Sequence, residues 1–211
     1  MRVLNLFSGL GGNRRLWEGV EVTAVEYEAD IAAFYQDHYP QDTVIVGDAY
    51  EYLLEHWEDF DFIWASVPCP SHSRARYWSS KGGAYTPVYP DFRLYEVIAF
   101  LKHFAPCPWA VENVKPYYDQ PALYQANYTM GRHMFWCNFP IQAFSPKDSD
   151  IKDGKREEWQ QDHQIDLAGY KFKDRTDKLL RNCVSGELGL HILECSRTES
   201  PETIEQMGLS L

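Results

Sequence analysis

Short apolar runs alternate with amphipathic segments along the first 115 residues. The runs have the length and the β-branched residues of strands, and the segments between them repeat apolar positions with helical spacing. This pattern predicts strands over residues 3–7, 22–26, 43–46, 60–66 and 109–112, and helices over 14–18, 30–38, 49–57 and 92–104. Strands that alternate with helices form βαβ units. We therefore expect an α/β fold with a mostly parallel sheet and helices on both of its faces.

The second half of the chain has a weaker pattern. Residues 124–128 and 133–141 could pair as two later strands, 145–164 are polar and predict a loop or mobile insertion, and 177–195 return to helical periodicity. The last residues predict a tail or a short helix. The stretch 67–90 is irregular, and so long a loop in a compact domain is usually functional or disordered. It follows the fourth predicted strand, at the sheet edge where ligands bind in α/β folds.

Composition and charge limit the class of protein. At 211 residues, 45% hydrophobic and 24% charged, the chain fits one domain and is not disordered, collagen-like or a coiled coil. A formal net charge of −11 argues against a simple basic nucleic-acid binder. The charge is uneven, however: residues 1–66 hold 3 Lys/Arg and 13 Asp/Glu, whereas residues 67–182 hold 16 and 13. We therefore expect an anionic partner to meet the middle of the chain.

The cysteines and the apolar runs bear on the cellular compartment. The chain has five cysteines without CxxC spacing, which favours neither a disulfide framework nor a zinc site. No run approaches 18 apolar residues, and the first residues lack the organisation of a secretory signal. We therefore expect a reducing, cytoplasmic compartment, with no membrane span and no metal.

Glycines and carboxylates follow three of the predicted strands. Gly9, Gly11 and Gly12 form a strand-to-helix turn, where missing side chains let a ligand approach the backbone. Glu26 ends the second strand, where a carboxylate can accept hydrogen bonds from ribose hydroxyls. Asp48 follows the third strand and could hold an adenine amino group. Three such features at successive strand ends predict a site for a nucleoside cofactor.

Two further motifs carry reactive groups. Cys69 lies between two prolines in SVPCP, which stiffen the loop and aim the thiol. A thiolate suits attack on a soft electrophilic carbon such as C6 of a pyrimidine. At the end of the fifth strand, Glu112 can hydrogen-bond or protonate a ring nitrogen, and Asn113 could orient the neighbouring loop.

In this order, the motifs resemble those of the DNA (cytosine-5) methyltransferases. The resemblance runs through LNLFSGLGG, VEYE, GDAYEYL, SVPCPSHS, VENV, GRHMFW and LLRNCVSGELGLHIL. It implies a Rossmann-like class I methyltransferase fold with S-adenosylmethionine as cofactor. It assigns cofactor binding to Phe7, Gly9, Leu10, Gly12, Glu26, Tyr27, Asp48, Ala49, Pro68, Asn182 and Val184. It assigns catalysis to Cys69, Glu112, Asn113 and Arg132, and substrate contacts to Ser73, Arg74 and Arg76.

The resemblance also implies a mechanism. The Cys69 thiolate adds to cytosine C6, Glu112 stabilises the ring at N3, and C5 accepts the methyl group. A base then removes the C5 proton and Cys69 is expelled. In duplex DNA the cytosine must first be flipped out of the stack. The loop 67–90 is expected to close over it, with Arg74, Arg76 and Lys81 near phosphates.

The chain departs from the family pattern at several points. Asn5 stands where the family has Asp, Pro70 replaces a Gln, and an Arg-x-Arg pair is reduced to Arg132 and His133. The segment between the last two motifs is also short for a target-recognition domain. We therefore expect a catalytic and cofactor-binding domain over 1–138, a minimal target-recognition or insertion region over 139–177, and a returning C-terminal helix over 178–211.

The short recognition segment leaves the substrate and the partners open. The favoured substrate is double-stranded DNA, with recognition aided by a possible protein partner, in a prokaryotic or phage-encoded cytoplasmic enzyme. The alternatives keep the chemistry on RNA, single-stranded DNA or a nucleotide, or make the chain an inactive cofactor- or DNA-binding module. Intact Cys69, Glu112 and Asn113 disfavour the inactive module.

Overall fold

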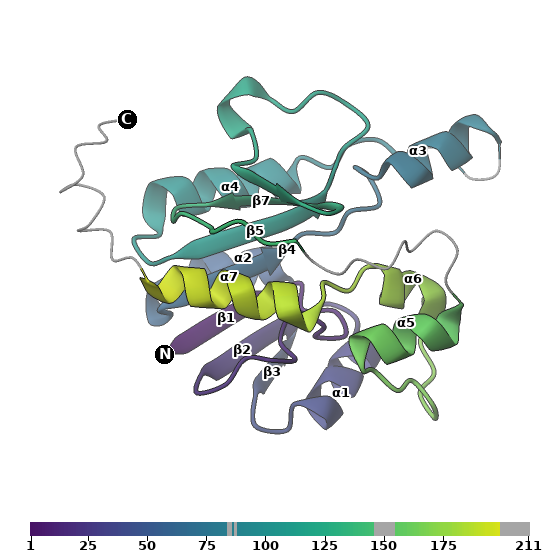
Figure 1. Ribbon diagram of the computed structural model, residues 1–211, viewed down its shortest axis with the longest axis horizontal. Helices are drawn as coiled ribbons and strands as arrows, with labels where there is room; N and C mark the ends of the chain where they lie inside the picture. The colour runs from purple at the N-terminus through teal and green to yellow at the C-terminus, as the bar shows by residue number, and fades with distance from the viewer. Residues whose placement is uncertain (84–85, 87, 146–154, 199–211) are drawn as a thin grey trace.

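A seven-stranded sheet forms the centre of the computed structural model, which describes residues 1–83, 86, 88–145 and 155–198 (Figure 1). The strand order is β3-β2-β1-β4-β5-β7-β6. The first five strands are parallel, and β7 runs antiparallel to both β5 and β6. The strands are β1 Arg2–Leu6, β2 Glu21–Glu26, β3 Thr43–Val46, β4 Phe62–Ser66, β5 Trp109–Val114, β6 Tyr128–Met130 and β7 His133–Cys137.

Helices connect and cover these strands, which confirms the predicted α/β class. The helices are α1 Ala29–His38, α2 Ala49–His56, α3 Arg74–Lys81, α4 Arg93–Phe104, α5 Arg156–His163, α6 Thr176–Arg181 and α7 Gly186–Thr198, with short 3₁₀ turns at Trp57–Asp59 and Ala122–Tyr124. No helix among the described residues has the length and apolarity needed to cross a bilayer.

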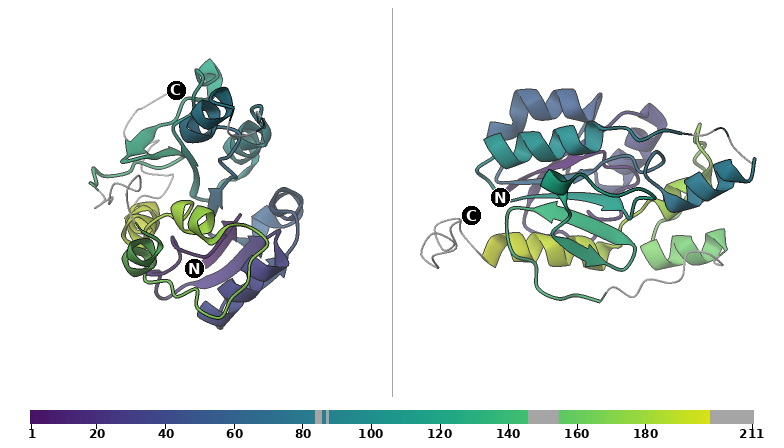
Figure 2. Two further views of the ribbon diagram at one scale, coloured as in Figure 1. Left: turned by 90° about the vertical axis from the view of Figure 1, so that its right-hand side faces the viewer. Right: turned by 90° about the horizontal axis from the view of Figure 1, so that it is seen from above.

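The two faces of the sheet carry separate apolar clusters, because successive strand residues point to opposite sides. On β1, Leu4 and Leu6 pack with residues of α2 and α4, whereas Val3 packs with residues of α7. On β4, Ala65 joins the first cluster and Trp64 the second. Figure 2 shows the result in its right-hand view, with α2 and α4 above the sheet and α7 below it.

A third cluster joins the N-terminal half to residues 155–180. Phe34 of α1 packs with Trp159 of α5 and with Ile165 and Leu167 of the following loop. The prediction of a loop or mobile insertion over 145–164 is therefore wrong for its last part, which forms α5. Trp159 supplies the apolar anchor, and the Glu158 carboxylate accepts a hydrogen bond from the backbone of Lys155 at the helix start.

Three other predicted elements, over residues 14–18, 67–90 and 177–195, differ from the structure. Residues 14–16 form turns and residues 17–18 have no regular structure, because Arg14 is drawn into a buried ion pair described below. The stretch 67–90 is not wholly irregular, since α3 lies within it and the Ser73 hydroxyl caps its first turn. The periodicity over 177–195 corresponds to two helices, α6 and α7. The predictions for 146–154 and 199–211 lie outside the described residues.

The strand order reverses between β1 and β4, and this reversal locates the crevice of an open α/β sheet. Connections from β1 and β4 leave toward opposite sides, so a gap opens at the carboxyl ends of the two strands. The glycine turn follows β1 and the SVPCP loop follows β4. Both predicted motifs therefore lie at the edge of the sheet where a ligand can enter.

Candidate functional site

A cavity of about 540 Å³ lies at this edge of the sheet, within the usual size of a ligand pocket. Its walls come from the ends of the first five strands, from the turn before β7 and from the segment that joins α6 to α7. The predicted site residues that line it are Phe7, Gly9, Leu10, Gly12, Glu26, Tyr27, Asp48, Ala49, Pro68, Cys69, Glu112, Arg132, Asn182 and Val184.

The glycine turn, which contributes Gly9 and Gly12 to the cavity wall, has an unusual backbone. Phe7, Gly9 and Gly11 all have positive φ angles, of 55°, 53° and 76°. Residues other than glycine rarely adopt this region of backbone conformation. A Cβ on Gly11 would lie 2.5 Å from the ring of Tyr39, whose hydroxyl donates a 2.8 Å hydrogen bond to the Gly11 carbonyl. At this position the sequence therefore needs glycine for both conformation and space.

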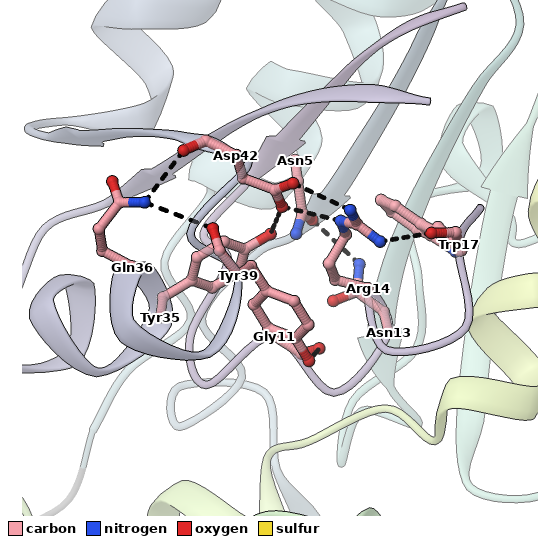
Figure 3. Close-up of polar contacts among 9 residues, drawn as sticks. All are labelled: Asn5, Gly11, Asn13, Arg14, Trp17, Tyr35, Gln36, Tyr39 and Asp42. Carbon is pink, nitrogen blue, oxygen red and sulfur yellow. Dashed lines mark hydrogen bonds and ion pairs between the residues drawn. The ribbon is translucent and has the colours of Figure 1, made fainter. Parts of the chain in front are cut away.

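A buried ion pair holds the end of the glycine turn. Figure 3 shows the Arg14 guanidinium facing the Asp42 carboxylate, with two parallel contacts of 2.8 and 2.9 Å. Arg14 also donates to the Trp17 carbonyl at 2.6 Å, and the Tyr35 hydroxyl donates to Asp42 at 3.0 Å. Both charged residues are about 95% buried. This network fixes residues 11–17 against α1 and its following loop.

Glu26 joins the ends of β1 and β2 at the cavity wall. Its carboxylate accepts hydrogen bonds from the backbone N–H of Gly9, at 2.9 Å, and of Glu28, at 3.0 Å. Burial raises the pKa of Glu26 above its ordinary value, and these hydrogen bonds oppose that shift. Each carboxylate oxygen can accept a further hydrogen bond. The geometry therefore leaves Glu26 able to receive the hydroxyls of a ribose.

Asp48 has several partners already. Burial acts to raise its pKa, but the value lies below the ordinary one because the carboxylate accepts from the backbone of Tyr50 and Glu51 and pairs with Arg93. The first two contacts cap α2, and Arg93 Nη1 lies 3.2 Å from Asp48 Oδ2. Arg93, which the sequence reasoning missed, also lines the cavity. Tyr27 also lines the cavity and is largely exposed.

Cys69 lies in the loop after β4, where its own carbonyl accepts hydrogen bonds from the backbone N–H of His72 and Ser73. Its Sγ donates to Oδ1 of Asn182 across 3.8 Å. Burial, followed by the nearby negative charge of Glu112, raises the pKa of Cys69 to about 11, against the opposing effect of Arg132. The thiol is therefore largely protonated at neutral pH.

Glu112 has a partner that the sequence reasoning did not assign. Its Oε1 lies 2.7 Å from Nδ1 of His133, and both side chains are buried. The pairing of β5 with β7 places Val114 opposite His133, so His133 lies diagonally across from Glu112 on the same face. The only sequence signal was the position of His133 after Arg132 at the start of a predicted strand.

Arg132 bridges the two halves of the cavity wall. Its Nη2 donates a 3.0 Å hydrogen bond to the Cys183 carbonyl. Its Nε is buried and has no hydrogen-bond partner among the residues that the structure describes. An unsatisfied buried donor costs free energy, so Arg132 Nε can donate a hydrogen bond to an acceptor atom of a ligand.

Four predicted residues lie outside the cavity wall. Asn113 is buried behind it, where its side chain donates to the Val67 carbonyl at 2.9 Å and so holds the loop that carries Cys69. Ser73 caps α3, Arg74 Nε donates to the Pro116 carbonyl at 3.0 Å, and Arg76 Nη2 donates to the Thr86 carbonyl at 3.3 Å. These contacts orient α3 relative to the site.

The cavity fits a nucleoside cofactor on its own geometry. A Cβ on Gly9 would meet nothing within 4 Å, so a ligand can come up to the backbone there. The hydroxyl of Ser8 also lines the cavity and is buried without a hydrogen-bond partner among the described residues. Among the residues that the structure describes, no group of three His, Cys, Asp or Glu side chains could hold a metal ion.

The C-terminal segment closes the cavity by approaching the glycine turn very closely. A Cβ on Gly12 would lie 2.5 Å from the Val184 carbonyl oxygen, and one on Gly189 would lie 2.1 Å from the Asn13 carbonyl oxygen. Arg15 ties the same elements together through a 2.6 Å ion pair with Glu187. Two glycines therefore permit the backbone contact that brings Asn182 to Cys69.

We expect Gly12→Ala to destabilise the fold by about 1–3 kcal/mol, because the added methyl group meets a backbone atom that cannot rotate away. Urea denaturation measures the change. Gly47→Ala is the matched control, since a Cβ there meets nothing within 4 Å and Gly47 has no positive φ. Equal stability of the two variants would contradict the close approach.

Comparison with known proteins identifies the family. A family model described as C-5 cytosine-specific DNA methylase matches residues 1–125, which include Cys69 and Glu112. No curated protein matches the chain.

Among solved structures, a mutant of Spodoptera frugiperda DNMT2 is 17% identical with a TM-score of 0.43, and the match covers 70% of this chain and 53% of that one. The Entamoeba histolytica methyltransferase EhMeth is 14% identical with a TM-score of 0.39, and the match covers 74% of this chain and 62% of that one. A putative DNA modification methyltransferase encoded within an E. coli prophage is 20% identical with a TM-score of 0.36, and the match covers 57% of this chain and 34% of that one. The chain thus spans about half of the DNMT2 chain and a third of the prophage one.

The family match and the sheet lead to the same conclusion. The strand order, with its antiparallel β7, is that of the predicted Rossmann-like class I methyltransferase fold, and the match covers more than half of the chain. The chain therefore belongs to the C-5 cytosine-specific DNA methylase family, enzymes that transfer a methyl group from S-adenosylmethionine to C5 of cytosine in DNA.

Proposed function

We propose that this chain methylates cytosine C5 through a covalent bond between Cys69 and C6 of a base rotated out of duplex DNA. The observation that carries the proposal is that Cys69, the Glu112–His133 pair and the glycine turn line one cavity. A nucleophile, a proton donor to the ring and a cofactor site are the three parts that the reaction needs.

The chemistry assigns each step to a side chain of this protein. The Cys69 thiolate forms a bond to C6, while the ring electrons shift toward N3, which takes a proton from Glu112. C5 then has enamine character and becomes nucleophilic. After C5 has been methylated, a base removes its remaining proton. The electron pair of that C–H bond forms the C5–C6 double bond, the Cys69–C6 bond breaks and its electron pair returns to sulfur. N3 gives its proton back to Glu112, and the aromatic ring is restored.

The thiolate must be generated within the site, because burial and Glu112 raise the pKa of Cys69 to about 11. Arg132 acts in the opposite direction and lies in the same wall. The Glu112–His133 contact joins two buried side chains. We infer that His133 keeps the Glu112 side chain turned toward the base and that Asn113 holds the Cys69 loop beside it.

The cofactor site is proposed on the residues at the strand ends. Glu26 would receive the ribose hydroxyls, Tyr27 and Asp48 would flank the adenine, and the glycine turn would lie against the remainder. When bound, S-adenosylmethionine supplies the methyl group. Asn182 and Val184 would complete this wall from the C-terminal side. A cytoplasmic, prokaryotic or phage-encoded enzyme remains our proposal for its setting.

Transfer of labelled methyl groups tests the substrate class. We expect the full chain to label duplex DNA that contains cytosine, and to leave matched duplexes with 5-methylcytosine at every cytosine unlabelled. Transfer RNA, single-stranded DNA and dCMP are the parallel substrates. Labelling of one of these three without labelling of the duplex would overturn the DNA assignment and keep the chemistry. Absence of labelling on all substrates, from protein that binds the cofactor in calorimetry, would support the inactive module instead.

A further inference from the structure

We propose that α3 and two adjoining tyrosines bind the DNA strand beside the target base by stacking on its bases. We call Tyr77, Trp78, Lys81, Tyr89 and Tyr117 the α3 platform. The inference deepens the proposed function, on which its choice of DNA rests. It adds stacking of bases on aromatic side chains, none of which is among the assigned substrate contacts Ser73, Arg74 and Arg76.

The shape of α3 is unusual for a helix of a compact domain. None of its residues is buried, and Figure 1 shows it projecting from the body at the upper right. The exposed fraction is 66% for Trp78 and 80% for Tyr89. Tyr89 follows α3 in the chain and lines one hollow with Tyr77 and Lys81 of that helix. Large aromatic side chains dominate interface energetics, so Trp78 on α3 and Tyr89 beside it indicate a contact surface.

Ordered aromatic stacking supports the platform. The rings of Tyr77 and Tyr117 are parallel within 4° and have centroids 4.1 Å apart. They form one wall of a hollow of about 140 Å³, which Lys81 and Tyr89 help to line. Lys81 Nζ also lies 5.0 Å from the ring centre of Tyr77 and 5.9 Å from that of Trp78. Flat rings and a cation are thus held together in advance of binding.

The charge of the surrounding segment selects an anionic partner. Residues 67–90 contain three Lys/Arg and no Asp or Glu, whereas the chain as a whole has a net charge of −11. Residues 155–178, within the predicted target-recognition region, instead hold equal numbers of both signs, and several of these pair with each other or with Glu28 of the cofactor side. The three cationic residues of segment 67–90, Arg74, Arg76 and Lys81, all lie on α3.

The position of α3 ties this surface to the reacting base. Ser73 caps the helix, and the backbone N–H groups of His72 and Ser73 donate to the Cys69 carbonyl. A strand that presents cytosine to Cys69 must therefore pass next to the first turn of α3. Cationic grooves with exposed aromatic rings bind nucleic-acid strands by stacking, with little dependence on sequence. We infer that the α3 platform holds unstacked nucleotides next to the extruded cytosine.

Binding of labelled oligonucleotides to the full chain tests the α3 platform without requiring turnover. We expect Trp78→Ala and Tyr89→Ala each to weaken binding of a single-stranded oligonucleotide by roughly 5- to 100-fold, as loss of one stacked base implies. Trp78→Phe should restore most of the affinity. Lys81→Ala should lower the slope of log affinity against log salt by about 1. Phe104→Ala is the matched control, since Phe104 is also an exposed aromatic residue at a helix end, on α4.

The outcomes separate this proposal from the proposed function. Wild-type affinity in both Trp78→Ala and Tyr89→Ala, in an enzyme that methylates duplex DNA, would overturn the α3 platform and leave the proposed function intact. Weakened oligonucleotide binding in these variants supports the platform even if no substrate is methylated. Equal competition by a polyglutamate peptide of similar length would also overturn it, because the surface would then recognise charge alone.

Discussion

Cys69→Ala should abolish methyl transfer, with a loss on the order of 10⁴-fold or more, the scale seen when a catalytic nucleophile is removed. The thiol is the group that makes C5 reactive, and the described cavity wall holds Cys69 at the end of β4 beside Glu112. Cofactor binding and stability should change little, because alanine removes one atom from the cavity surface. Methyl transfer to duplex DNA and cofactor calorimetry give the two readouts.

Cys107→Ala is the matched control for this variant. Cys107 is also free and partly buried, and burial raises its pKa to about 11, as for Cys69. It does not line the cavity. If Cys107→Ala is fully active and Cys69→Ala is inactive, methyl transfer depends on the position of the Cys69 thiol in the cavity and not on thiols in general. Turnover by Cys69→Ala within tenfold of the wild type would exclude the covalent mechanism.

A fluorinated base makes the covalent step visible. With fluorine at C5, no proton can be removed after methyl transfer, so the Cys69–C6 bond cannot be broken by elimination. We expect the wild-type chain and Cys107→Ala to form an adduct with 5-fluorocytosine DNA that survives denaturing electrophoresis. Cys69→Ala should form none. An adduct that maps by mass spectrometry to another cysteine would reassign the nucleophile.

Arg14→Ala should lower the free energy of unfolding by about 3–5 kcal/mol, because it leaves the Asp42 carboxylate buried without its charge partner. The variant also removes the hydrogen bond to Trp17 and the support of the glycine turn. Urea denaturation gives the stability, and cofactor calorimetry should show weaker binding in the fraction that stays folded. A loss below 1 kcal/mol would contradict a tightly coupled network.

Two variants control for this effect. Arg2→Ala removes an exposed ion pair, in which Arg2 Nη2 lies 3.6 Å from Asp61 Oδ1, and should cost no more than about 1 kcal/mol. The double variant Arg14→Met with Asp42→Leu leaves no unpaired charge at this site. Because it replaces two buried charges with apolar groups, it should be more stable than Arg14→Ala.

The parallel part of the fold could be predicted because its signals are local. Each of the first four strands is a short apolar run that ends at a turn or a carboxylate, so hydrophobic spacing was enough to place it. Residues 14–18 failed for the opposite reason. Their sequence suits a helix, but Asp42, 28 residues away, draws Arg14 into the interior. Local propensity gave way to a tertiary contact.

Site residues could be predicted where the type and position of a single residue indicate its chemistry. They were missed where the role depends on contact with a second residue that is distant in sequence. Gly9, Glu26 and Cys69 follow strands, and their chemistry can be inferred from type and position. His133 gained its role only when β7 was placed beside β5, because the sheet register brings it to Glu112. Helix α5 was missed because seven of its eight residues are polar or charged, and Trp159 is its one apolar residue.

The closure of the cavity by Asn182 and Val184 has a consequence for the folding of the chain during its synthesis. The family match ends at Gln125, yet part of the cavity wall is supplied by residues made more than 50 positions later. Domains begin to form from the N-terminus during synthesis. A nascent chain can therefore build the sheet early while its reaction chamber stays open. The cavity wall is complete only once the segment that joins α6 to α7 has docked, so we expect activity to appear late in folding.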